Sequence, residues 1–103
     1  MIKFRIYDDL KYKYFEVKGH ADGEFVNAGG FNAVCGMVSV LAQSAMYGCR
    51  KYARKTTIIK NEPGWLKFSI HKYDSVGVAI MDTAMIGIKA VKEQFPSCFK
   101  DGD

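Results

Sequence analysis

The chain shows one succession of hydrophobic patterns twice: two stretches of alternating apolar and polar residues, then a longer stretch with apolar residues three and four positions apart. Alternation is typical of half-buried strands, and the longer spacing is typical of amphipathic helices. The predicted order is therefore strand, strand, helix, strand, strand, helix. The simplest architecture for it is an α+β fold in which an antiparallel four-stranded sheet carries both helices on one face. The chain has 103 residues, enough for a single domain, 1–103.

The first half of the chain predicts a hairpin followed by a helix. Residues 1–7 and 11–18 alternate, and a pair of aspartates supplies the turn between them. The helix follows Asn32, whose side chain is expected to accept a hydrogen bond from the backbone N–H of Cys35, and it ends near Ala53. Its predicted apolar stripe consists of Val34, Val38, Leu41, Ala45, Cys49 and Tyr52.

The second half predicts another hairpin and a more apolar helix. Strands at 56–60 and 65–71 flank a turn at 61–64, and a helix over 75–95 is stopped by Pro96. Its predicted stripe consists of Ile80, Ala84, Ile88, Val91 and Phe95, widened by Met81 and Met85. The first three turns of this helix carry a single charged residue. So small a chain offers little to cover such a helix on two sides, so we expect a homodimer.

Composition places the chain among small folded proteins. No stretch reaches the roughly 18 uninterrupted apolar residues of a membrane span, and the N-terminus has a strand pattern rather than that of a signal peptide. Three cysteines without CxxC spacing predict neither a disulfide framework nor a zinc site. We therefore expect a cytoplasmic protein with no metal and no cofactor. The net charge of +4 could favour nucleic acid or ribosomal surfaces without establishing either.

The candidate chemistry lies between a strand end and a helix start. His20 stands just beyond a predicted strand, and Cys35 falls in the first turn of a predicted helix, where the positive end of the helix favours a thiolate. The polar loop at 21–31 could close and bring imidazole and thiol together. Ser39, one turn further on, could hydrogen-bond to a substrate or to the thiolate. The alternative is that Cys35 is a small buried residue and His20 a polar group at a strand end.

Other chemical groups carry weaker predictions. Cys49 lies on the buried stripe of the first helix, Cys98 lies near a polar tail without a partner, and His71 faces outward from a strand. The loop glycines do not form a GxGxxG or P-loop motif. A basic cluster near the end of the first helix is either a solvated face or an RNA contact; it consists of Arg50, Lys51, Arg54 and Lys55.

Two motifs together resemble a known family. Gly19-His20-Ala21 is followed by a glycine-bearing loop and by the helix start Val34-Cys35, leading into Val38-Ser39 and Leu41. This pairing is similar to the ribosomal-processing cysteine protease family known as Prp. The resemblance spans nearly the whole chain, including the Gly-Trp-Leu-Lys segment of the second hairpin and the closing Gln-Phe-Pro.

The resemblance implies a dimeric cytoplasmic endopeptidase. It would remove a short N-terminal extension from large-subunit ribosomal protein twenty-seven, cutting after a pair of aromatic residues held in an apolar groove. Cys35 would be the nucleophile, His20 the general base and Ser39 an active-site companion. The substrate loop would contain Gly23, Gly29, Gly30 and Phe31.

The chain departs from the family pattern at Asn32, where members carry Asp. Asn and Asp cap helices comparably, but a carboxylate that could orient the imidazolium is lost. A second hypothesis is therefore a peptide-binding or ribosome-binding homologue of the same fold with impaired activity. A third is a basic RNA-associated module.

Overall fold

The computed structural model describes residues 1–20 and 32–100. Its elements are β1 (Lys3–Asp8), β2 (Tyr12–Lys18), α1 (Ala33–Tyr52), β3 (Thr56–Glu62), β4 (Trp65–His71), α2 (Ser75–Gln94) and the 3-10 helix η2 (Pro96–Cys98). The predicted order and the α+β class are confirmed. The predicted strand and helix ends agree to within two residues at each boundary.

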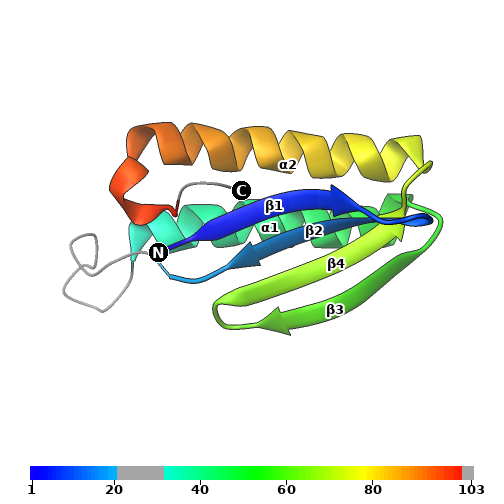
Figure 1. Ribbon diagram of the computed structural model, residues 1–103, viewed down its shortest axis with the longest axis horizontal. Helices are drawn as coiled ribbons and strands as arrows, with labels where there is room; N and C mark the ends of the chain where they lie inside the picture. Colours follow the sequence, from blue (N-terminus) through cyan, green and yellow to red (C-terminus); the bar gives the residue numbers. More distant parts are fainter. Residues whose placement is uncertain (21–31, 101–103) are drawn as a thin grey trace.

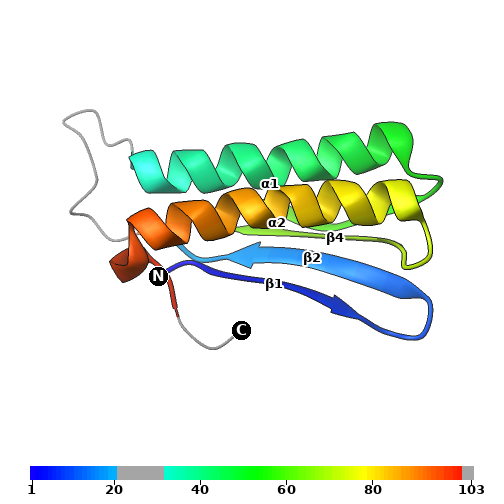
Figure 2. The ribbon, with the colours of Figure 1, turned by 90° about the horizontal axis from the view of Figure 1, so that it is seen from above.

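The four strands form one antiparallel sheet in the order β1-β2-β4-β3. The two long helices lie side by side on one face of this sheet, as expected (Figures 1 and 2). The opposite face carries no helix in the part of the chain that the structure describes.

The core lies between the sheet and the helices. Phe15 of β2 and Phe68 of β4 are opposite each other in the register, and their fully buried rings stack at a centroid distance of 5.2 Å. The helices cover them with a buried set on α1 and α2: Val34, Val38, Ala42, Ala45, Met46, Cys49, Met81, Ala84, Met85, Ile88 and Val91. Apolar residues at every second position of the strands thus pack against apolar residues three or four positions apart on α1 and α2.

Helix α1 begins as its sequence predicts. The side-chain oxygen of Asn32 accepts a hydrogen bond of 3.0 Å from the backbone N–H of Cys35, which confirms the expected cap. The expected burial of Tyr52 is wrong, because this last helical residue is 64% exposed. The buried stripe runs instead through Ala42 and Met46, which rotates Tyr52 toward solvent.

The second hairpin is longer than predicted. Pairing of β3 with β4 continues to Glu62 opposite Trp65, beyond the predicted strand end at 60. A register shift between Ile58 and Lys60 lets the ladder continue. The turn is thereby reduced to two residues, Pro63 and Gly64, with Gly64 at φ +78° as a type II turn requires.

The C-terminal segment adds to the sheet edge, which the sequence did not indicate. Ile2 donates to the carbonyl of Cys98 and accepts from the N–H of Lys100, both at 2.8 Å. Phe99 is buried, with its ring edge-on to Phe4 at 5.8 Å. The prediction that Cys98 lies near a polar tail without a partner is therefore wrong, because this bridge draws it into the core.

Within residues 1–20 and 32–100, no helix is both long enough and apolar enough to cross a bilayer.

Candidate active site

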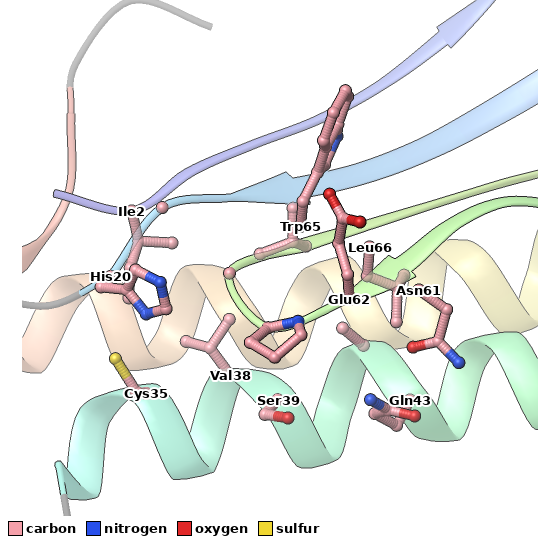
Figure 3. A pocket seen from close by; sticks show the side chains of 15 residues that line it. Ile2, His20, Cys35, Val38, Ser39, Gln43, Asn61, Glu62, Trp65 and Leu66 are labelled. Atoms are coloured by element: carbon pink, nitrogen blue, oxygen red, sulfur yellow. The ribbon is translucent and has the colours of Figure 1, made fainter.

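A pocket of about 400 Å³ lies at the edge of the sheet where β2 ends and α1 begins (Figure 3). Four segments line it: the start of the chain, the end of β2, the first turns of α1 and the β3–β4 turn. The lining residues are Ile2, Val17, Gly19, His20, Cys35, Val38, Ser39, Ala42, Gln43, Asn61, Glu62, Pro63, Gly64, Trp65 and Leu66. The pocket therefore gathers residues from both halves of the sequence.

His20 is placed by the end of β2 and by the β3–β4 turn. The N–H of Gly19 donates to the carbonyl of Gly64 over 2.8 Å, which fixes the backbone next to His20. Gly19 takes φ +103°, a conformation that lets the chain leave the strand toward the pocket. The exposed imidazole then lies against Gly64.

Cys35 is placed by the cap of α1. It occupies the third helical position, where its backbone N–H bonds to Asn32, and its side chain is half-buried. Its sulfur is directed toward the imidazole of His20 across the pocket (Figure 3). A long helix carries a partial positive charge at its N-terminus, and this charge favours an anion such as a thiolate.

Ser39 lies one helical turn beyond Cys35 and lines the same pocket (Figure 3). His20, Cys35 and Ser39 thus line one pocket, while Asn32 caps the helix that carries Cys35 and Ser39. The predicted loop residues Gly23, Gly29, Gly30 and Phe31 lie outside the described residues.

The contribution of the β3–β4 turn to the pocket is not evident from the sequence. Its residues Asn61 to Leu66 line the pocket, and Asn61 faces Gln43 of α1 at the end away from Cys35 (Figure 3). From the sequence, Pro63 and Gly64 predict only a turn. The Pro-Gly pair next to an apolar strand does indicate a turn of defined backbone shape. The sequence does not indicate that this turn lies beside His20.

The remaining thiols and the second histidine lie elsewhere. Cys49 is buried on α1 as predicted, and its burial, together with the charge of Asp74, raises the pKa of its thiol to about 11. His71 is exposed on β4 as predicted, with its ring 5.7 Å from that of Tyr12. Across residues 1–20 and 32–100, no three side chains of His, Cys, Asp or Glu gather as metal ligands.

The arrangement suits acyl transfer through a thiol. A cysteine at a helix start supplies a nucleophile, and an imidazole directed at it can take up and return a proton. The apolar side chains of Val17, Val38 and Leu66 line the pocket beside these groups. Such a pocket can hold an apolar side chain of an extended peptide next to the thiol.

Comparisons with known proteins identify a family and similar folds. Residues 1–100 match the family model for cysteine protease Prp. A comparison with curated protein sequences found no match. The fold resembles a crystal structure of the essential ribosomal processing protease Prp from S. aureus with a covalently linked product peptide. That match has a TM-score of 0.78 and 20% identity, and covers 97% of this chain and 96% of the other. A second structure of that S. aureus protease, with a substrate peptide, gives a TM-score of 0.75 at 15% identity with the same coverage.

Proposed function

The chain belongs to the cysteine protease Prp family, and on that premise we propose that it is a cysteine endopeptidase with a Cys35–His20 dyad. The observation that carries the proposal is that Cys35 and His20 line the same pocket, with the sulfur on the side of the imidazole (Figure 3). Ser39 and the cap residue Asn32 support the dyad from the first two turns of α1.

In the proposed reaction, His20 takes the proton of the Cys35 thiol, and the thiolate attacks the scissile carbonyl. The tetrahedral intermediate collapses as His20 gives that proton to the leaving amine, and a thioester to Cys35 remains. Water then attacks the thioester while His20 accepts its proton. The acid product leaves, and the proton returns to the thiol.

Backbone N–H groups in the first turn of α1 are our candidates for binding the oxyanion. Two of them are already engaged: Cys35 donates to the side chain of Asn32 and Gly36 donates to its carbonyl. The N–H groups of Ala33 and Val34 are the other two of this turn, and we propose them as the candidates. Asn32 would fix their direction by holding the helix start in place.

We propose that the substrate is the N-terminal extension of large-subunit ribosomal protein twenty-seven. The solved Prp structures hold a substrate peptide and a covalently linked product peptide. The apolar lining of this pocket supports an aromatic residue before the cut. Ile2, Val38 and Leu66 would contact that residue, and Ser39 would hydrogen-bond to the peptide.

We also propose a cytoplasmic homodimer. Large apolar side chains are exposed along both helices, including Val40 at 67%, Tyr47 at 55%, and Ile86 at 69%. A groove of about 340 Å³ between α1 and α2, lined mostly by apolar groups, lies among them. The three cysteines are present as thiols, which fits a reducing compartment. Light scattering should show a dimer, and Ile86→Glu should shift it toward the monomer.

The test uses ribosomal protein twenty-seven from the same genome, with its native N-terminus. Mass spectrometry after incubation should show one cut, following aromatic residues. Cys35→Ala should abolish the cut, while Lys51→Ala, an exposed site at the far end of the same helix, should leave it unchanged. Cleavage by Cys35→Ala at the wild-type rate would overturn the proposal. Binding of the peptide by the wild type without any cut would favour the peptide-binding homologue instead.

A further inference from the structure

The sheet face opposite the helices carries a layer of cations and aromatic rings. Because side chains alternate along strands, the register places on this face a group of charged and aromatic residues: Lys3, Arg5, Tyr7, Tyr14, Glu16, Lys18, Lys60, Glu62, Trp65 and Lys67. We call this set the outer sheet face. Figure 3 shows Trp65 of this set directed away from α1. The strand order β1-β2-β4-β3 makes these positions neighbours although they are far apart in the sequence.

Aromatic rings hold the cations of the outer sheet face. The ammonium nitrogens of Lys18 and Lys60 lie 4.2 and 4.8 Å from the centroid of the Trp65 ring. The ammonium nitrogen of Lys67 lies 5.4 Å from the ring centroid of Tyr14. Cation–π contacts of this length fix a lysine while leaving its full charge in place. The lysines are therefore ordered without being neutralised.

One buried carboxylate organises this layer. Glu16 is 8% exposed, and it accepts from the guanidinium of Arg5 at 2.9 Å and from the indole N–H of Trp65 at 2.8 Å. Burial alone would raise the pKa of Glu16, but these two hydrogen bonds and the positive charges of Arg5 and Lys67 together lower it. Glu16 therefore stays ionised and orients Trp65, on which the lysines lie.

The charge of the outer sheet face is strongly one-sided. Glu16 offsets Arg5, with which it forms the only ion pair of this face among the described residues. Glu62, at the end of β3, pairs with Trp65 in the register and is therefore the other acidic strand residue on this face among the described residues. The single negative charge of Glu62 is outnumbered by the three lysines that contact aromatic rings, Lys18, Lys60 and Lys67. The chain as a whole has a net charge of +4. A face of this kind attracts a polyanion.

We propose that the outer sheet face binds the phosphate backbone of RNA. Phosphates match ordered lysines spaced along adjacent strands. The rings of Tyr7 and Tyr14 stack on each other at 4.9 Å, and lysines lie over Trp65, so the rings are already engaged. Contact is therefore through phosphates rather than base stacking, and sequence preference is weak. The choice of RNA over other polyanions rests on the proposed function, because a ribosomal protein substrate is encountered beside ribosomal RNA.

The experiment measures fluorescence anisotropy of a labelled single-stranded RNA of about 20 nucleotides, mixed in sequence, across a potassium chloride series. The Lys18→Gln/Lys60→Gln/Lys67→Gln variant should bind about tenfold or more weakly at moderate salt. Its slope of log affinity against log salt should fall in magnitude by about 2, since each phosphate contact on a single strand contributes about 0.7. Arginine at the same three positions should restore binding, which separates charge from misfolding.

A matched control removes three charges from the last turn of α1 and the segment that follows it, through Arg50→Gln, Lys51→Gln and Lys55→Gln. This variant should keep wild-type RNA affinity. Equal loss in both triple variants would overturn the assignment to the outer sheet face, because net charge alone would then explain binding. Tight binding of a glutamate-rich peptide together with absence of RNA binding would also overturn it.

Binding and cleavage are scored separately, so the two proposals fail separately. RNA binding is measured with Cys35→Ala as well as the wild type, and the affinity should be the same. Intact peptide cleavage without RNA binding would overturn only the RNA proposal. RNA binding that depends on the three lysines, with no cleavage of any extension, would support the outer sheet face and count only against the protease assignment.

Discussion

The imidazole of His20 lies directly against the Cα of Gly64. A Cβ added to Gly64 would come within 2.8 Å of Cε1 and 3.1 Å of Cδ2 of His20. Gly64 also has a φ of +78°, which L side chains rarely adopt. The β3–β4 turn is thus shaped to the imidazole on the other side of the pocket, and Gly64 is a positioning residue for the proposed general base.

Gly64→Ala should therefore impair cleavage. The new Cβ must displace the imidazole or the turn, and a shift of about 1 Å at a catalytic group can reduce the rate by about a hundredfold. We expect kcat to fall by about tenfold to a hundredfold, with a smaller change in KM, in steady-state assays on the extension peptide.

Gly48→Ala in the interior of α1 is the matched control. There the added Cβ would meet Ile80 at 3.4 Å, an ordinary contact, and alanine favours a helix over glycine by up to about 1 kcal/mol. This variant should cleave normally and melt no lower than the wild type. Wild-type kcat in Gly64→Ala would mean that His20 is not positioned by the turn.

Thiol labelling should distinguish Cys35 from the other cysteines. Burial raises the pKa of Cys49 to about 11, so only about one molecule in ten thousand carries that thiolate at pH 7. Cys98 is buried as well, whereas Cys35 is half-buried at the pocket. Brief iodoacetamide treatment of the native protein should label Cys35 alone, as read by peptide mass spectrometry.

The same reaction in denaturant should label all three cysteines. Native labelling of Cys49 at a rate similar to that of Cys35 would contradict the burial of Cys49. Protection of Cys35 that persists in the native protein at pH 8 would instead contradict the proposed nucleophile.

The parts of the site that are local in the sequence could be predicted from it. The alternation of Phe15 and Val17 indicates a strand, and Asn32 three residues before Cys35 indicates a helix cap. Both depend on interactions within a few residues. The expected proximity of His20 to Cys35 follows from where a strand ends and a helix begins, and the structure places both in one pocket.

The parts that depend on strand order could not be predicted. Hydrophobic alternation shows which residues face the core but not which strands are neighbours. The pairing of Lys18 and Lys60 over Trp65 exists only because β2 and β3 both flank β4. The fit of Gly64 to His20 has the same origin, since it joins the end of β2 to the β3–β4 turn.

Asp74 should make stability depend on pH. Its carboxylate accepts backbone N–H bonds from Arg54 at 2.8 Å and from Gly77 at 3.1 Å, and these bonds lower its pKa. A carboxylate with a depressed pKa in the folded state stabilises the fold above its unfolded pKa of about 3.9, and this contribution is lost as pH falls through the folded pKa. Asp74→Asn should therefore melt below the wild type at pH 7.

The difference in Tm between Asp74→Asn and the wild type should narrow as the pH falls below about 4, because the unfolded wild type then takes up a proton at this carboxyl, and the charge contribution is gone once the pH is below the lower folded-state pKa. Thermal melts followed by circular dichroism between pH 7 and pH 2.5 test this. Asp82 is exposed on α2, the helix that Asp74 caps, and the Tm of Asp82→Asn should differ little from that of the wild type at every pH. If the Tm difference between Asp74→Asn and the wild type is the same at every pH, then the charge of Asp74 does not contribute to stability, and its stabilising effect comes from packing and hydrogen bonding alone.

Phe99 should stabilise the fold and the pocket together. Its ring is buried edge-on to Phe4, and the bridge beside it holds Ile2, which lines the pocket. Phe99→Ala should lower the free energy of unfolding by about 3–5 kcal/mol in urea titrations, because it removes a large buried ring. Leu10→Ala, at a side chain 90% exposed, should change it by about 0.5 kcal/mol or less.

Phe99→Ala should also raise KM under conditions where the protein remains folded. The reason is that the backbone of Ile2 bonds to Cys98 and Lys100, on either side of Phe99. A large loss of stability with unchanged KM would show that the C-terminal bridge supports the core but not the pocket.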